Sequence, residues 1–348
     1  MKNLKVGISI GDLNGIGSEI VLKTFAEPMM LELCTPIIFA NKGFLSFVRK
    51  HFNINLSLQG ISAPSEAVEG KINVINVWNE KVKINFGEED KSLGKYTLKS
   101  LEAAVKAIQK EEIEVLVTAP INKNVIQSDQ FNFPGHTDYL AKELGGESLM
   151  FMVSEELKVG LLTDHVPVKD VAQKITPQLI EDKVRLITQS LKQDFRIQRP
   201  KIAVLGINPH SGDNGVIGKE DEKTLKPTIK KLNDEGNLIF GPYAADSFFG
   251  TKNYKNFDAI IAAYHDQGLI PFKTLSFGSG VNFTAGLSRV RTSPDHGTAY
   301  EIAGKNKADF KSFREAVFLG LDVYRRRQEY KELTANPLPI SKPKRRKK

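Results

Sequence analysis

Five of the six histidines lie in or beside polar loops that follow apolar, strand-like runs. Three of them, His165 in LLTDHVP, His210 in GINPHSGD and His265 in AAYHDQG, come within a few residues of the end of such a run. Neutral imidazoles are typical ligands of a catalytic zinc ion, which keeps one position open for water or substrate. The three histidines are therefore a candidate metal site. Because their spacing is long-range, the alternative that each one only hydrogen-bonds to its own loop stays open.

Two cations of the C-terminal half lie in glycine-rich stretches without a run of acids: Lys273 in PFKTLSFGSGVNF and Arg291 in SRVRTSPDHGT. An ammonium and a planar guanidinium that face one anion suit a phosphate monoester or a carboxylate. His136, Thr137 and Asn282 can add hydrogen bonds to the same anion. These residues predict an anion site built from loops, against the alternative that both cations are solvated surface charges.

The N-terminal segment GISIGDLNGIGSEI places Gly11, Gly15 and Gly17 between a strand-like run and a helix that Ser18 would cap. These glycines do not match the G-x-G-x-x-G spacing of a Rossmann dinucleotide site, and the segment is no phosphate loop with a lysine. It predicts a tight strand-to-helix turn that shapes a cleft wall, with Asp12 as a polar contact.

The elements that must position these residues alternate along the chain. Short β-branched runs predict strands over residues 4–10, 35–41, 72–78, 115–120, 148–154, 159–164, 201–209 and 258–264. Apolar spacing of three and four predicts helices over residues 18–27, 94–111, 133–145, 176–195 and 309–330. This alternation indicates an α/β fold with a mostly parallel sheet, whose polar loops converge at the carboxyl ends of the strands.

The bulk composition limits the class of protein. The chain has 348 residues, 41% hydrophobic and 26% charged, enough for two domains with sizeable cores. It has one cysteine, Cys34, and its first residues lack the apolar core of a secretory signal, so we expect a reducing, cytoplasmic setting. No apolar run approaches the roughly 18 residues that span a bilayer, so we expect no integral membrane protein.

The net charge of +8 is concentrated at the C-terminus, where SKPKRRKK supplies six cations. Without them the net charge is +2. We therefore expect a short solvated tail and no nucleic-acid partner, although a basic tail that anchors the protein to nucleic acid or an anionic membrane is the alternative.

Long and unusual motifs occur in one order between residues 5 and 324: GDLNGIGSE, TAPINK, FPGHTDYLA, INPHSGDNGVIGKEDE, GPYAADSFF, YHDQGLIPFK and GVNFTAGLSRVRTSPDHGTAYEIAGKNKAD. The series resembles the 4-hydroxythreonine-4-phosphate dehydrogenase family of pyridoxal 5'-phosphate biosynthesis. The family usually has proline where Leu13 and Ser18 stand. The basic tail lies outside the resemblance.

The resemblance implies an α/β fold of two α/β/α domains with a cleft between them, as in isocitrate and isopropylmalate dehydrogenases, and no Rossmann fold. We expect a discontinuous first domain of residues 1–125 and 290–330. A second domain of residues 126–289 would carry most metal and substrate loops, and residues 331–348 would form a basic, disordered tail.

The resemblance also implies a homodimer whose two subunits share each active site. A divalent metal, zinc first and magnesium or cobalt as alternatives, would be held by His165, His210 and His265, the last from the other subunit. The phosphorylated substrate would be bound by residues that match the family's motif: His136, Thr137, Lys273, Asn282 and Arg291.

The segment DHGTAYEIAGKNKAD is similar to the adenine-side loop of isocitrate and isopropylmalate dehydrogenases, which assigns His296, Gly297 and Ala299 to NAD, with NADP as the alternative. The alternative that Tyr300 and Ile302 only pack stays open. The proton acceptor stays open among Asp246, Lys273 and Asp266.

The expected reaction is NAD-dependent oxidation and decarboxylation of 4-phosphooxy-L-threonine to 3-amino-2-oxopropyl phosphate. Two alternatives remain: a dehydrogenase of a four-carbon sugar-acid phosphate such as threonate or erythronate 4-phosphate, and a metal-dependent phosphohydrolase.

Overall fold

The computed structural model describes residues 3–128, 131–133 and 135–337, and leaves the side chain of His136 undescribed. Its strands form one sheet of twelve in the order β3-β4-β2-β1-β5-β12-β11-β6-β7-β10-β8-β9. Their bounds are β1 Leu4–Ser9, β2 Cys34–Ala40, β3 Leu58–Ile61, β4 Ile72–Asn76, β5 Val115–Thr118, β6 Gly146–Val153, β7 Lys158–Leu161, β8 Lys201–Leu205, β9 Leu238–Tyr243, β10 Ala259–Ala262, β11 Val281–Leu287 and β12 Val290–Pro294.

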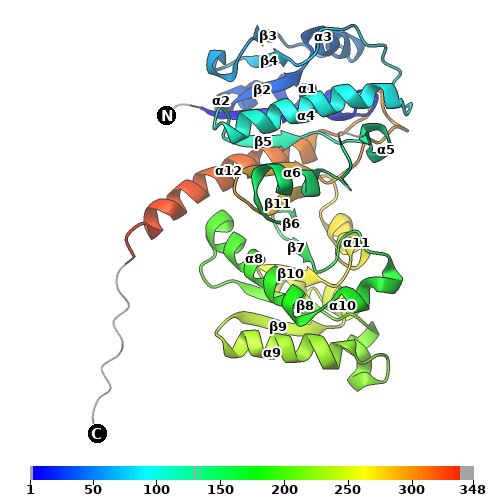
Figure 1. Cartoon of the computed structure of the whole chain (residues 1–348), viewed down its shortest axis with the longest axis vertical. Helices are drawn as coiled ribbons and strands as arrows, with labels where there is room; N and C mark the ends of the chain where they lie inside the picture. The colour runs from blue at the N-terminus through cyan, green and yellow to red at the C-terminus, as the bar shows by residue number, and fades with distance from the viewer. Residues whose placement is uncertain (1–2, 129–130, 134, 338–348) are drawn as a thin grey trace.

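The sheet is parallel at both ends and antiparallel in the middle. The pairings β12–β11, β11–β6 and β6–β7 are antiparallel, and the remaining described pairings are parallel. Helices lie on the faces of the sheet and give the molecule an upper lobe around β1–β5 and a lower lobe around β7–β10 (Figure 1). The α/β fold with a mostly parallel sheet, predicted from the sequence, is confirmed.

The longer helices are α1 Gly17–Ala26, α3 Lys42–His51, α4 Gly94–Gln109, α6 His136–Leu144, α8 Pro177–Phe195, α9 Lys226–Asp234, α11 His265–Leu275 and α12 Lys311–Thr334. Short helices are α2 Pro28–Leu33, α5 Lys123–Ile126, α7 Val171–Lys174 and α10 Ala245–Gly250. Within the part of the chain described here, no helix is long and apolar enough to cross a membrane.

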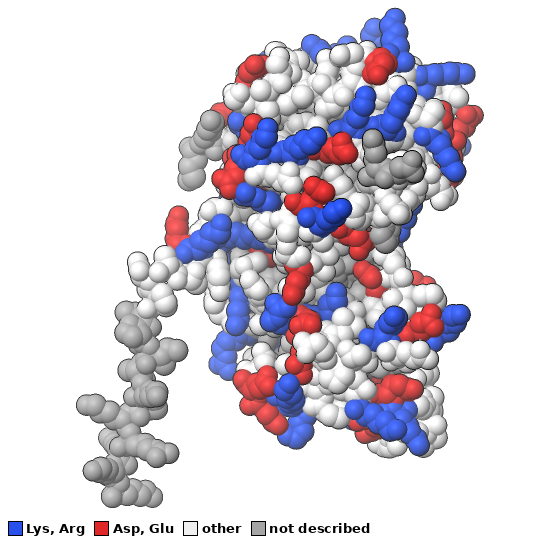
Figure 2. Space-filling model, in the orientation of Figure 1, with Lys and Arg blue, Asp and Glu red and all other residues white. Residues whose placement is uncertain are grey.

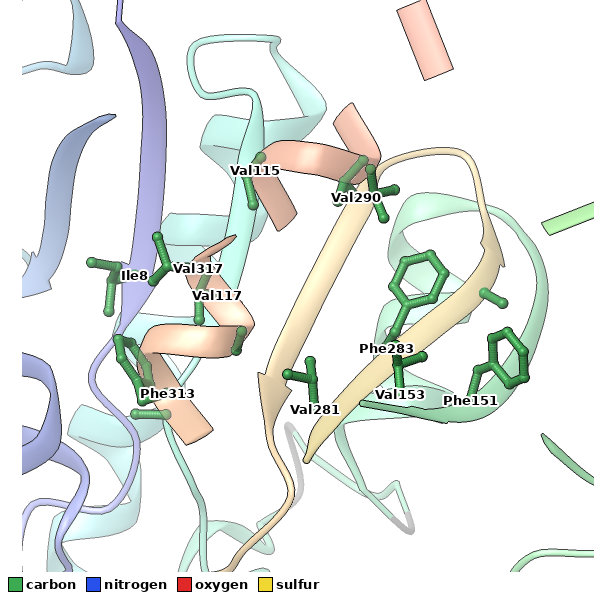
Figure 3. Packing of buried hydrophobic residues seen from close by; sticks show 14 of the residues in the cluster. Ile8, Val115, Val117, Phe151, Val153, Val281, Phe283, Val290, Phe313 and Val317 are labelled. Atoms are coloured by element: carbon green, nitrogen blue, oxygen red, sulfur yellow. The ribbon is translucent and has the colours of Figure 1, made fainter. Parts of the chain in front are cut away.

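Helix α12 packs across the middle of the sheet. Phe313 and Val317 of this helix lie against Ile8 and Val117 of β1 and β5 (Figure 3). Strand residues such as Ile8 and Val117 come from near-continuous apolar runs because both faces of this sheet are covered. The hydrophobic core therefore continues from the upper lobe into the antiparallel middle of the sheet.

The hairpin of β11 and β12 was not among the strands predicted from the sequence. Its strands carry Thr, Asn and Arg side chains and Gly286, so no apolar run marks them. A two-residue link, Ser288 and Arg289, joins the two strands. Arg291, expected in a loop, lies on β12 as a consequence.

Helix α11 also replaces a predicted loop. The segment HDQGLIPFKTL contains Gly268 and Pro271, which usually break a helix. Gly268 is required here because an added Cβ would lie 2.9 Å from a methyl carbon of Leu161 and 3.0 Å from Val159. His265 is therefore the first residue of a helix, and Lys273 lies on its last turn instead of in a glycine-rich loop.

The expected division into residues 1–125 with 290–330 and residues 126–289 stays a prediction. Helix α12 continues through residues 331–334, which were expected to belong to the tail, and residues 338–348 lie outside the described residues.

On the face seen in Figure 2, basic and acidic side chains are interspersed over both lobes.

Candidate active site

A cavity of about 260 Å³ lies where strands from both halves of the sheet end. Its wall includes residues that follow β5 and β7, the start of α11 and residues on β6, β11 and β12. The site residues predicted from the sequence that line it are Thr137, His165, His265, Lys273, Asn282, Arg291, His296 and Gly297. The convergence of strand-end loops on one cavity therefore brings together most of the predicted site.

A larger groove of about 590 Å³ lies elsewhere, between α8, α12 and the turn of the β11–β12 hairpin. None of the predicted site residues lines it. Its charged walls are internally paired, with Arg289 contacting Glu111 at 2.7 Å and Arg185 contacting Glu147. We therefore place the candidate active site in the smaller cavity.

His165 and His265 face each other at this cavity. Strands β7 and β10 are parallel neighbours, with Leu161 opposite Ala262, so the residues that follow them emerge side by side. The two imidazole rings lie 6.2 Å apart between centroids. Nδ1 of His265 is 2.8 Å from Oδ1 of Asp266, a carboxylate contact of the kind that orients metal-binding imidazoles.

His210 does not line this cavity. It lies on the turn Pro209–Gly215, where His210, Ser211 and Asp213 all have positive φ. Buried Asp221 holds the start of this turn by accepting hydrogen bonds from the backbone N–H groups of Ile207, at 2.8 Å, and Asn208, at 3.1 Å. Among the residues described, no three His, Cys, Asp or Glu side chains lie close enough to hold a metal ion, so the three-histidine site stays a prediction.

Arg291 is a buried cation at the cavity. Its side chain is 1% exposed, and its terminal nitrogens donate hydrogen bonds to the hydroxyls of Thr284 on β11, at 2.9 Å, and Thr118 on β5, at 2.6 Å. Burial lowers the pKa of Arg291 to about 9. Because desolvation disfavours its charge, an anion in the cavity would stabilise this guanidinium.

Other predicted anion contacts surround the same space. Lys273 lies eight residues after His265 on α11, so both side chains emerge on one face of the helix, with Leu269 between them. Oδ1 of Asn282 is buried and accepts no hydrogen bond from the described residues, so this atom suits an N–H or O–H donor of a ligand and not its anionic group. Thr137 lies on the first turn of α6, whereas the side chain of His136 is outside the described residues.

The predicted cofactor loop is fixed to the N-terminal turn. Thr298 accepts a hydrogen bond from the backbone N–H of Ile16 at 3.0 Å, and Gly15 packs so closely that a Cβ there would lie 3.0 Å from Thr298. Ala299 has a φ of 44°, in the left-handed region, and His296 and Gly297 reach the cavity. The N-terminal turn therefore supports this loop.

Asp12 is buried in that turn. Its Oδ1 accepts the N–H groups of Asn14 and Gly15, and its Oδ2 accepts the hydroxyl of Tyr300 at 2.8 Å. Burial raises the pKa of Asp12, and burial together with Asp12 raises the pKa of Tyr300. Tyr300 thus does more than pack, because it ties the loop to the turn.

The three candidate proton acceptors differ in position. Lys273 lines the cavity, but Asp246, on α10, and Asp266 do not. The sequence analysis missed Lys123, Asp138 and Asp295, which also line the cavity. The TAPINK motif, a polar loop directly after a strand-like run, was the available signal for Lys123.

Comparison with known proteins identifies the family. The family model described as "Pyridoxal phosphate biosynthetic protein PdxA" matches residues 32–320. A 4-hydroxythreonine-4-phosphate dehydrogenase of Bacteroides thetaiotaomicron is 46% identical over 96% of this chain and 93% of its own length. A D-threonate 4-phosphate dehydrogenase of Cupriavidus necator is 36% identical over 92% of this chain and 98% of its own length.

Superposition on solved structures supports the same family. A 4-hydroxythreonine-4-phosphate dehydrogenase from Klebsiella pneumoniae superposes with a TM-score of 0.79 at 30% identity, covering 93% of this chain and 98% of that one. The corresponding enzyme from Burkholderia phymatum gives a TM-score of 0.75 at 34% identity, covering 93% and 99%. The chain therefore belongs to the PdxA family of pyridoxal phosphate biosynthetic proteins, the family of oxidoreductases whose motifs its sequence resembles.

Proposed function

We propose that the protein catalyses the NAD-dependent oxidation and decarboxylation of 4-phosphooxy-L-threonine to 3-amino-2-oxopropyl phosphate. The observation that carries the proposal is the presence in one cavity of buried Arg291, Lys273 and the loop of His296 and Gly297. The first two suit a phosphorylated acid. The third belongs to the segment that resembles the adenine-side loop of isocitrate and isopropylmalate dehydrogenases. Family membership supports a nicotinamide cofactor. We propose that this cofactor is NAD and not NADP.

The protein groups hold the substrate so that two bonds can break in turn. Arg291 and Lys273 would bind the anion, and the unpaired Oδ1 of Asn282 would accept a hydrogen bond from a donor of the substrate, so that the substrate is held in one orientation. When bound, the nicotinamide cofactor would accept a hydride from C3 while a base takes the proton of the hydroxyl, so that a 3-oxo acid and the reduced cofactor would form. The bond to the carboxylate then breaks, carbon dioxide leaves with its electron pair left behind, and a proton returns to that carbon. The base is open among Asp246, Lys273 and Asp266. A lysine that binds the anion as an ammonium has no lone pair to accept a proton, so Lys273 fills one of these two roles, and its substitution is the first test because it lines the cavity.

We propose that His165, His210 and His265 hold a divalent cation, with zinc as the first choice. Such an ion suits the facing imidazoles of His165 and His265. The carboxylate of Asp266 contacts the imidazole of His265 and would orient it. When bound, the ion would supply Lewis-acid polarisation of the substrate oxygen. Because His210 lies outside the cavity that His165 and His265 line in one chain, a second copy would complete the set of three, either through His265, as the resemblance implies, or through His210.

Exposed apolar side chains that follow these histidines in the chain support the proposal of a homodimer. Large apolar side chains are exposed shortly after each of them: Val168 after His165, Val216 and Ile217 after His210, and Ile270, Leu275 and Phe277 after His265. Phe277 is 94% exposed in the single chain. Large exposed apolar side chains mark an interface between proteins where they form a contiguous patch. We propose that a second copy covers this surface and shares the site.

The cytoplasmic location belongs to the same proposal. Its support is the biosynthetic family and the single cysteine, Cys34, which is buried and whose pKa burial raises to about 12. A protonated, enclosed thiol needs no oxidising environment.

The test is NADH formation by purified protein with NAD and 4-phosphooxy-L-threonine, before and after chelation and with added zinc, magnesium or cobalt. We expect turnover that depends on the metal. D-threonate 4-phosphate is the second candidate substrate, because a relative at 36% identity is named for it. A higher kcat/KM on that substrate would replace the first proposal, and release of inorganic phosphate without NAD would contradict both.

A further inference from the structure

Lys123 is a cation at the cavity that no part of the proposed mechanism uses. It is the first residue of α5, and its side chain lines the cavity. The helix is held in place because Oδ1 of Asn122 accepts the backbone N–H groups of Asn124, at 2.8 Å, and Val125, at 3.3 Å. Nδ2 of Asn122 donates to Glu89 at 2.8 Å. Lys123 is therefore presented from a fixed backbone.

The stem of Lys123 runs beside the start of α6. Its Cε lies 3.7 Å from the position that a Cβ would take at Gly135. Gly135 and Thr137 line the cavity as well. The ammonium of Lys123 is thus carried on the same side of the cavity as Thr137, a predicted contact of the phosphorylated substrate.

The charge of Lys123 meets no acceptor among the residues that the structure describes. Within the described part of the chain, its ammonium forms neither a hydrogen bond nor an ion pair, whereas lysines such as Lys23 and Lys231 pair with Glu19 and Glu181 at 2.6 and 2.7 Å. Of the two acids at the cavity, Asp295 already accepts a hydrogen bond from Ser312 at 3.1 Å.

A phosphoryl group can accept contacts from several cations at once. A phosphate monoester carries close to two negative charges at neutral pH, and a substrate carboxylate adds one more. Arg291 and Lys273 supply two positive charges, which the carboxylates of Asp138 and Asp295 at the same cavity partly offset. An ammonium next to a phosphoryl group acts as a point charge and forms charge-assisted hydrogen bonds without demanding one geometry.

We propose that Lys123 binds the phosphoryl group of the substrate, together with Arg291 and Lys273. The inference rests on the proposed function for the identity of the phosphorylated ligand. It makes α5 a third element of the anion site, beside β12 and α11.

The test compares Lys123→Met with the wild type. A hydrogen bond to a charged group contributes about 1.5–3 kcal/mol, so KM for 4-phosphooxy-L-threonine should rise about 10- to 100-fold. The kcat value and the KM for NAD should stay within about threefold of wild type, because Lys123 touches neither the reacting carbon nor the cofactor in this proposal. Lys123→Arg should restore part of the affinity.

The matched control is Lys110→Met. Lys110 is exposed, follows α4 and does not line the cavity, so its removal should leave both KM values unchanged. An unchanged substrate KM in Lys123→Met would overturn the proposal. A loss of kcat at constant KM with a shifted pH profile would also overturn it, because Lys123 would then transfer protons.

Binding of inorganic phosphate separates this proposal from the proposed function. Phosphate should raise the Tm of the wild-type protein, and Lys123→Met should need about 10 to 100 times more phosphate for the same rise. This response requires no turnover, so it tests Lys123 even if 4-phosphooxy-L-threonine is not oxidised. Equal responses of variant and wild type would contradict the assignment.

Discussion

The hydroxyl of Tyr300 donates a hydrogen bond to the buried carboxylate of Asp12 across 2.8 Å, and it thereby joins two segments 288 residues apart. The Asp12 turn leads into α1, and the Tyr300 loop leads back to His296 and Gly297 at the cavity. The pair is a positioning device, because Asp12 and Tyr300 do not line the cavity themselves.

Tyr300→Phe should therefore weaken cofactor binding more than substrate binding. Removing the donor leaves Oδ2 of Asp12 buried without this partner, and the loop loses its tie to the N-terminal turn. We expect the KM for NAD to rise about 5- to 30-fold, in line with about 1–2 kcal/mol for the lost hydrogen bond, with a smaller change in the substrate KM. Steady-state kinetics with each ligand varied in turn measure the split. Equal changes in both KM values would show a general disturbance of the cavity.

The same substitution should give a stability loss that depends on pH. Burial raises the pKa of Asp12 in the folded protein, and the Tyr300 hydroxyl lowers it, so Tyr300→Phe should raise it further. Ionising Asp12 in the folded state then costs more. The variant should match the wild type more closely below the ordinary aspartate pKa of 3.8 and fall behind as pH rises through the raised pKa of Asp12. Urea unfolding over a pH series tests this, and a difference that is constant with pH would refute it.

Mixed dimers should reveal a shared metal site. His265 lines the cavity and His210 does not, so we expect the two ligands of one site to come from different subunits. His210→Ala and His265→Ala should each be inactive and lose metal. After the two variants are unfolded together and refolded, about a quarter of the wild-type activity should return, because half of the dimers are mixed and each mixed dimer has one intact site.

Refolding each variant alone is the control and should restore nothing. The absence of recovery in the mixture, with dimers present, would mean that one chain supplies both ligands. Metal content of the mixture should rise in parallel with activity.

Gly268→Ala should displace α11. The added Cβ would lie within 3.0 Å of Leu161, Ala262 and Val159 in the packed core, so the helix must shift. His265 and Lys273 move with it. Overpacking of this kind costs about 1–3 kcal/mol in the free energy of unfolding, and we expect kcat/KM to fall by at least tenfold. Gly250→Ala is the matched control, because nothing lies within 4 Å of a Cβ there, and its activity should be unchanged.

A buried ion pair joins α8 to α12 far from the cavity. Nε of Arg327 lies 2.6 Å from Oδ1 of Asp194, and Ser190 donates to the same carboxylate at 2.8 Å. Asp194→Ala should lower the free energy of unfolding by about 3–5 kcal/mol, because Arg327 would keep a buried, unpaired charge. Substrate and NAD KM values should not change.

The exposed ion pair of Glu147 and Arg185 serves as the comparison for the loss of stability. Glu147→Gln breaks the contact with Arg185 and should change stability by less than about 1 kcal/mol. Replacing Asp194 and Arg327 together by Leu and Met should recover much of the stability lost in Asp194→Ala. Denaturant unfolding measures all of these, and similar losses for Asp194→Ala and Glu147→Gln would contradict the buried-pair argument.

The sequence alone determined the fold class, the family and most of the candidate site. The strands that lead to His165 and His265 are uninterrupted apolar runs, and such runs report their own burial through local composition. The motifs around Thr137, Lys273 and Arg291 are long enough to be recognised one by one. None of this required knowing which strands are neighbours.

Only the tertiary structure decided which side chains meet. His165 and His265 are 100 residues apart and face each other because β7 pairs with β10. Arg291 is buried because its strand, β12, pairs with β5 on one side and β11 on the other, although no apolar run marks β12 in the sequence. The Tyr300–Asp12 hydrogen bond and the position of Lys123 beside Gly135 likewise join distant segments. Local sequence encodes the preferences of each segment, but contacts between segments depend on the pairing order of the sheet, which is set by the packing of the whole chain.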